Sequence, residues 1–178
     1  MTNEADRRLL LRIARDAIVA HVGAAPPPAP ERSAVLDRPT GAFVTIHRQG
    51  ALRGCIGHLE ANEPLGHVIL RCAVAACSAD PRFPPVRAAE LHELDLELSL
   101  LGPLEPMLAV DEIEIGRHGL VVERDRLRGL LLPQVATEWR WDPVTFLAET
   151  CRKAGLPRDA WRNGARVWTF EAEVFGER

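Results

Sequence analysis

Residues 94 to 100 alternate strictly between apolar and polar side chains. Leucines occupy positions 94, 96, 98 and 100, and Asp95, Glu97 and Ser99 stand between them. Because successive side chains of a strand point to opposite faces, this pattern predicts a strand with one buried and one polar face. Such half-solvated strands belong to antiparallel or mixed sheets, so this stretch constrains the fold more than any other.

Three further segments carry strand patterns. Residues 41–54 and 119–129 each predict a β-hairpin, and residues 165–175 predict a closing strand. In the first hairpin a three-residue loop, Arg48 to Gly50, with Gly50 in the left-handed conformation, is a common connection. It would set the pairs Ile46–Leu52, Thr45–Arg53, Val44–Gly54 and Phe43–Cys55.

Helical spacing of apolar residues predicts helices over residues 4–21, 64–78, 133–139 and 142–154. A proline-rich loop covers residues 24–33 approximately. Helices and hairpins therefore follow one another without repeated βαβ units, which predicts an α+β fold. The length of 178 residues suits one domain, residues 1–178.

The composition narrows the function classes. The net charge of −3 gives no electrostatic footprint for DNA or RNA, and no apolar run reaches the length of a membrane span. Since the first residues lack the apolar region of a signal peptide, we expect a cytoplasmic protein whose four cysteines are reduced.

The segment LRGCIG, residues 52–57, holds the first candidate site. Alternation places Leu52, Gly54 and Ile56 on the core face and the remaining three residues, Arg53, Cys55 and Gly57, on the other. A guanidinium beside the thiol would lower its pKa, so Cys55 is a candidate nucleophile or substrate-gripping thiol. The alternative is a small, covered strand residue, because cysteine is often buried.

A metal site is disfavoured, and no cofactor is predicted. Cys55 and His58 fall on opposite strand faces, while Cys72 and Cys77 lie on apolar helix faces. Cys151 has core spacing in its helix. Lys153, the single lysine of the chain, either complements the end of that helix or faces a substrate.

Several stretches together resemble the AMMECR-one domain family, protein A of the AmmeMemoRadiSam system. They are GAFVTIHRQG followed by LRGCIG, then ADPRFPPV, LELSLLGPLEP and HGLVVE, and finally the long stretch from residue 129 to residue 161. The similarity spans residues 5–175 approximately. It implies an α+β domain with a larger and a smaller lobe, a mixed or antiparallel sheet with flanking helices, and a cleft lined by LRGCIG.

The resemblance also implies site residues. Cys55, Arg53 and Lys153 are the expected catalytic residues, and Asp80 and Cys151 belong to matching motifs. The expected substrate-binding residues are Gly54, Gly57, Arg82, Phe83, Gln134 and Trp161.

These residues lead us to expect one of two functions. One is a cysteine-dependent enzyme or substrate-handling component that works on a small molecule or peptide with a radical SAM protein, in a system that also contains a Memo-like protein. The other is a non-catalytic adaptor that grips a partner protein or peptide in the same cleft.

Overall fold

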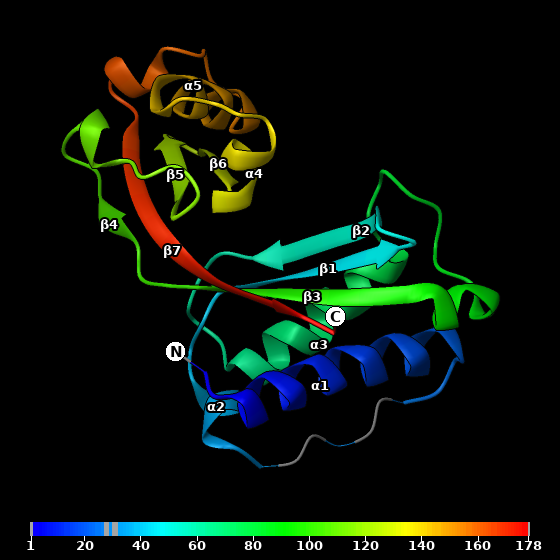
Figure 1. Cartoon of the computed structure of the whole chain (residues 1–178). Helices are drawn as coiled ribbons and strands as arrows, with labels where there is room; N and C mark the ends of the chain where they lie inside the picture. The colour runs from blue at the N-terminus through cyan, green and yellow to red at the C-terminus, as the bar shows by residue number, and fades with distance from the viewer. Residues whose placement is uncertain (1, 27–28, 30–31, 178) are drawn as a thin grey trace. The chain divides into compact units, whose positions relative to one another are not determined.

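The computed structural model describes residues 2–26, 29 and 32–177. The chain divides into two compact units (Figure 1). The first unit comprises the residues up to Leu101 together with those from Glu173 onward, and the second unit is Gly102–Ala172. Both units combine helices with antiparallel strands, which confirms the predicted α+β fold. Over the residues described, no helix is long and apolar enough to cross a membrane.

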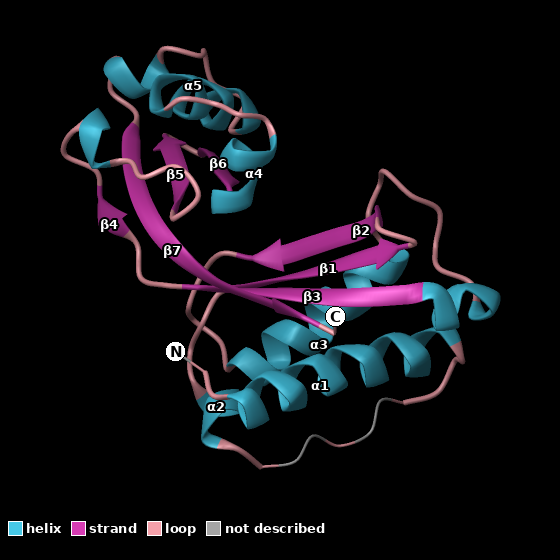
Figure 2. Ribbon diagram, in the orientation of Figure 1, coloured by secondary structure: helices cyan, strands magenta, loops and turns pink. Residues whose placement is uncertain are grey.

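The first unit is built on an antiparallel sheet. Strand β1 (Ala42–Arg48) lies between β2 (Ala51–His58) and β3 (Leu94–Leu101). Helices α1 (Glu4–Val22) and α3 (Leu65–Ser78) cover one face of this sheet (Figure 2), and the short α2 (Ala34–Asp37) precedes β1. The alternating leucines of β3 point into the core that these helices close, as their spacing predicts.

Helix α1 begins where its sequence supplies a cap. The Asn3 side chain accepts a hydrogen bond from the Asp6 N–H, and the Asp6 carboxylate accepts one from the Asn3 N–H. This reciprocal capping satisfies two of the N–H groups that a helix start leaves without a partner. The predicted helix of residues 4–21 is therefore confirmed to within one residue.

The long strand β7 (Arg166–Gly176) contributes to both units. In the second unit it pairs with β4 (Glu105–Pro106) and with β5 (His118–Arg124), and β5 pairs with β6 (Leu127–Leu131). In the first unit the segment after it is anchored, because Glu177 accepts hydrogen bonds from the Arg15 guanidinium and from the Leu96 N–H.

Helix α5 (Pro143–Lys153) packs against β5 and β6 and closes the core of the second unit, and α4 (Pro133–Glu138) lies beside β5. Short 3₁₀ turns cover Ala88–Glu93 in the first unit and Val110–Glu112 and Ala160–Arg162 in the second. The helices predicted over residues 133–139 and 142–154 are thus confirmed, each slightly shorter than expected.

Two details differ from the sequence-based expectation. Helix α2 follows the proline-rich segment and was not predicted, and of that segment residues 27–28 and 30–31 lie outside the described residues. The predicted register of the first hairpin is wrong. Gln49 and Gly50 both have positive φ, 52° and 79°, so a two-residue turn joins Arg48 to Ala51.

A β-bulge then shifts the pairing. Ile46 pairs with Gly54 while His47 pairs with Leu52, so Arg53 is the extra residue of β2. Leu52, predicted on the core face, is instead 40% exposed, whereas Ile56 packs against the core as expected.

Candidate functional site

Cys55 lies on the outer face of the first unit's sheet, the face opposite α1 and α3. It pairs with Thr45, whose neighbours Val44 and Ile46 are fully buried beneath the helices. The Thr45 hydroxyl donates a hydrogen bond to the Cys55 Sγ at 3.3 Å. Cys55 is half-buried, whereas the other three cysteines of the chain are buried, so the thiol at this position is the most accessible one.

The DPRF segment binds the free edge of β2 at Cys55. The Asp80 carboxylate accepts a hydrogen bond from the Cys55 N–H at 2.9 Å, and Arg82 donates to the Cys55 carbonyl at 3.3 Å. The two side chains also form an ion pair at 2.7 Å, and the Arg82 guanidinium lies 5.5 Å from the centre of the half-buried Phe83 ring. These bonds, above all those from Arg82, hold the pKa of Asp80 well below its ordinary value.

The electrostatics at Cys55 contradict the expected low-pKa thiolate. Burial raises the pKa of the Cys55 thiol above its ordinary value, and the Thr45 hydrogen bond and the charge of Arg82 offset this effect only in part. The negative charges of Asp80 and Glu97 raise the pKa of the thiol further. Cys55 is therefore a protonated, neutral thiol at neutral pH.

Arg53 does not supply the cation at Cys55. From its position on the bulge, its guanidinium binds the Glu90 carboxylate at 3.0 Å and the Pro84 carbonyl at 2.9 Å. This ion pair borders a surface hollow of about 410 Å³. The expected Arg53–Cys55 partnership is thus wrong, because the extra residue of the bulge was not foreseen. The cation that lowers the pKa of the thiol is Arg82.

The two glycines of LRGCIG have packing roles. A Cβ at Gly54 would lie 2.2 Å from the carbonyl oxygen of Ala76 in α3, and a Cβ at Gly57 would lie 2.2 Å from the ring of Phe43. Both positions therefore require glycine in the absence of any ligand. Their assignment to substrate binding stays a prediction.

The remaining expected site residues belong to the second unit. Lys153 is exposed at the end of α5, and Cys151 is fully buried in the core, as its spacing predicts. Trp161 packs against that core with the Arg162 guanidinium 4.4 Å from its ring centre. The side-chain oxygen of Gln134 is buried and has no hydrogen-bond partner among the described residues. A partnership of these residues with Cys55 stays a prediction.

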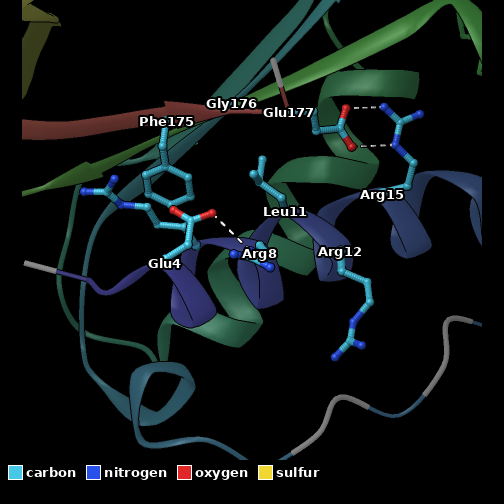
Figure 3. A pocket seen from close by; sticks show the side chains of 9 residues that line it. Glu4, Arg8, Leu11, Arg12, Arg15, Phe175, Gly176 and Glu177 are labelled. Atoms are coloured by element: carbon cyan, nitrogen blue, oxygen red, sulfur yellow. Dashed lines mark hydrogen bonds and ion pairs between the residues drawn. The ribbon is translucent and has the colours of Figure 1, made fainter.

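A larger hollow, of about 720 Å³, runs between α1 and the end of β7 (Figure 3). Arginines of α1 border it, but Arg15 is paired with Glu177 and Arg8 with Glu4. The Arg15–Glu177 pair fixes the C-terminal segment against α1, and the Arg8–Glu4 pair lies within α1, so we assign the hollow a structural role.

Sequence reasoning missed two residues that determine the site. Thr45 could have been found from the alternation of residues 42–48 only if the hairpin register had been right. Glu90 lies in the 3₁₀ turn Ala88–Glu93, 37 residues away from its partner Arg53, and no local pattern signals that contact.

Comparisons with known proteins identify the family and support the fold. A family model described as AMMECR1 matches residues 11–175. A protein of Methanothermobacter thermautotrophicus is 44% identical, over 96% of this chain and 93% of its own length, and one of Thermococcus gammatolerans is 45% identical, over 94% and 88%.

The crystal structure of an uncharacterized protein of Pyrococcus horikoshii is similar to the fold described above. It has a TM-score of 0.89 and 41% sequence identity, and the match covers 95% of this chain and 90% of that one. With a family model that spans nearly its whole length and relatives above 40% identity, this chain belongs to the AMMECR1 family.

Proposed function

We propose that the protein is a substrate-handling component that holds a small molecule or a peptide against the outer face around Cys55. A radical SAM partner carries out the redox chemistry on that substrate. One observation carries the proposal: the most accessible thiol of the chain sits on a fixed strand, half-buried and neutral, with a hydroxyl donating to its sulfur.

The protonation state of the Cys55 thiol favours ligand binding over nucleophilic attack. The nucleophile in cysteine chemistry is the thiolate, and a raised pKa leaves little thiolate at neutral pH. The Thr45 side chain that donates to the sulfur is a hydroxyl, which cannot serve as a general base near pH 7. A neutral S–H group can still donate a weak hydrogen bond to a ligand.

The partner follows from family resemblance and cysteine placement. The four cysteines lie at positions 55, 72, 77 and 151 and contain no CxxxCxxC motif, which a radical SAM protein uses to bind its iron–sulfur cluster. Three of them are buried in the two cores. We propose that radical chemistry belongs to another chain, and a Memo-like protein is the further expected partner.

A second candidate is an enzyme that uses Cys55 covalently. The accessibility of this one thiol favours it, since the buried thiols are shielded from any substrate. It requires a bound substrate or partner to lower the pKa of Cys55, because the thiol of the free protein is neutral.

Alkylation by iodoacetamide as a function of pH separates the two candidates. We expect Cys55 to react first in the native protein, with a midpoint above the ordinary thiol pKa of about 8.5, as read by peptide mass spectrometry. Cys55→Ser provides the control that lacks the fast-reacting site. A midpoint well below about 8.5 would support the covalent enzyme instead. If Cys55 stays inert until the protein unfolds, no ligand reaches it and the proposal fails.

A further inference from the structure

Three polar side chains form a row across the outer face of the first unit. Thr45 of β1 pairs with Cys55 of β2 on one side and with Glu97 of β3 on the other. Directly paired residues of antiparallel strands project from the same face. Cys55, Thr45 and Glu97, named here the Cys55 row, are therefore neighbours on one surface.

Glu97 is a half-buried carboxylate of the first unit. Glu63, Glu90, Glu93 and Glu173 are half-buried as well, and each is paired with an arginine. Within the described part of the chain, the Glu97 carboxylate has neither a hydrogen bond nor an ion pair, although the residue is half-buried. A partly desolvated charge without a counter-charge is unfavourable, so this position suits a cation that arrives from outside.

A second unpartnered group lies beneath this face, next to the row. Ser99, two residues along β3 on the same face, is fully buried, and its hydroxyl has no partner among the described residues. Gly176 borders Glu97 from β7, and a Cβ there would lie 3.9 Å from the Glu97 Cβ. A buried hydroxyl without a partner therefore lies two residues from Glu97 on the same face, and a strand position without a side chain borders Glu97 at its Cβ.

The other charges near Cys55 cancel. Asp80 is paired with Arg82, and Arg53 is paired with Glu90. Glu97 therefore leaves one uncompensated negative charge on the surface that contains the thiol.

We propose that Glu97 binds the protonated amino group of the ligand that is held at Cys55. The ligand class is a primary amine, with the ammonium on Glu97, and its adjoining part on Thr45 and the thiol. This inference rests on the proposed function, because it assumes that Cys55 is reached by a ligand, and it adds the chemical class of that ligand.

The test measures the electrostatic potential at Cys55. It uses three methanethiosulfonate reagents that carry an ethylammonium, a methyl or an ethylsulfonate group. Each forms a mixed disulfide with the cysteine and releases methanesulfinate. The measured quantity is the rate of the cationic reagent divided by that of the anionic reagent, normalised to the same ratio for a free thiol. All three reagents react with the same thiolate, so this normalised ratio is independent of the thiol pKa.

We expect this ratio to be about ten-fold in the native protein, from one unit charge at side-chain distance in a partly screened site. Glu97→Gln should bring it to about two-fold or less. Asp37→Asn, which removes an exposed carboxylate of α2 in the same unit, should leave it unchanged. For the unmodified protein, raising the salt from about 0.01 M to about 1 M should abolish the selectivity, which tests the charge without any substitution.

The source of the amine is tested by protection. If the ligand is a small molecule, n-butylamine slows the labelling of Cys55 by the neutral reagent; if it is a peptide, Gly-Lys-Gly slows it more. Equal cationic and anionic rates, or selectivity that survives Glu97→Gln, would overturn this inference and leave the proposed function standing. Failure of all three reagents to label Cys55 would overturn the proposed function itself.

Discussion

Asp80 holds the edge of β2 in place, and Asp80→Asn tests how much that contact stabilises the protein. The side chain is 2% exposed, and its carboxylate accepts hydrogen bonds from the N–H groups of Cys55 and Arg82 as well as from the Arg82 guanidinium. A hydrogen bond to a charged group contributes about 1.5–3 kcal/mol. Because the Arg82 side chain is 53% exposed, its ion pair counts for less than a buried one.

Asparagine keeps one acceptor oxygen and loses the charge and the other acceptor. We therefore expect Asp80→Asn to lower the free energy of unfolding by about 2–4 kcal/mol at pH 7, as measured by urea denaturation followed by circular dichroism. Asp37→Asn, at an exposed position of α2, is the matched control and should stay within about 0.5 kcal/mol of the original protein.

The stability difference between Asp80→Asn and the original protein should depend on pH. Since the pKa of Asp80 is lowered in the folded state, its contribution is complete above the ordinary aspartate pKa of about 3.9 and is lost as the pH falls through the lowered value. The stability difference between Asp80→Asn and the original protein should therefore shrink below about pH 4. The role of Asp80 would be refuted if Asp80→Asn lowered the free energy of unfolding by less than about 0.5 kcal/mol at pH 7, or if the stability difference did not shrink below about pH 4.

Three further substitutions test the packing and the thiol environment. Gly54→Ala should lower the free energy of unfolding by about 3 kcal/mol or prevent folding, because the new Cβ would lie 2.2 Å from the backbone carbonyl oxygen of Ala76. Gly50→Ala, in open space but at positive φ, should lower it by about 1 kcal/mol. Urea denaturation of both variants measures the difference. Thr45→Val removes the hydroxyl that lowers the pKa of Cys55, so its iodoacetamide profile should move to higher pH; an unchanged profile would exclude the Thr45 hydrogen bond.

The regular elements of the fold could be predicted because their patterns are local. The leucines of residues 94–100 form a buried face of β3, and the apolar spacing of residues 64–78 corresponds to α3. Burial of one face dictates both patterns, and each is complete within one element.

The site could be predicted only in part, because its geometry depends on a turn and on long-range contacts. Gln49 adopts the left-handed conformation that was expected for Gly50 alone, and this shortens the loop and changes the register. The bulge at Arg53 then directs that side chain to Glu90. Asp80 lies 25 residues after Cys55, so no spacing in the sequence shows that its carboxylate would accept the Cys55 N–H.

Strand β2 is the outer strand of its sheet, and an outer strand normally offers its N–H and C=O groups to another chain. At Cys55 these two groups are occupied by Asp80 and Arg82, which take the positions that a neighbouring strand would use. The DPRF segment therefore also protects against aggregation: it prevents a second copy from adding to β2 at the residue with the accessible thiol. Loss of Asp80 would expose that edge, and with it a route to edge-to-edge self-association.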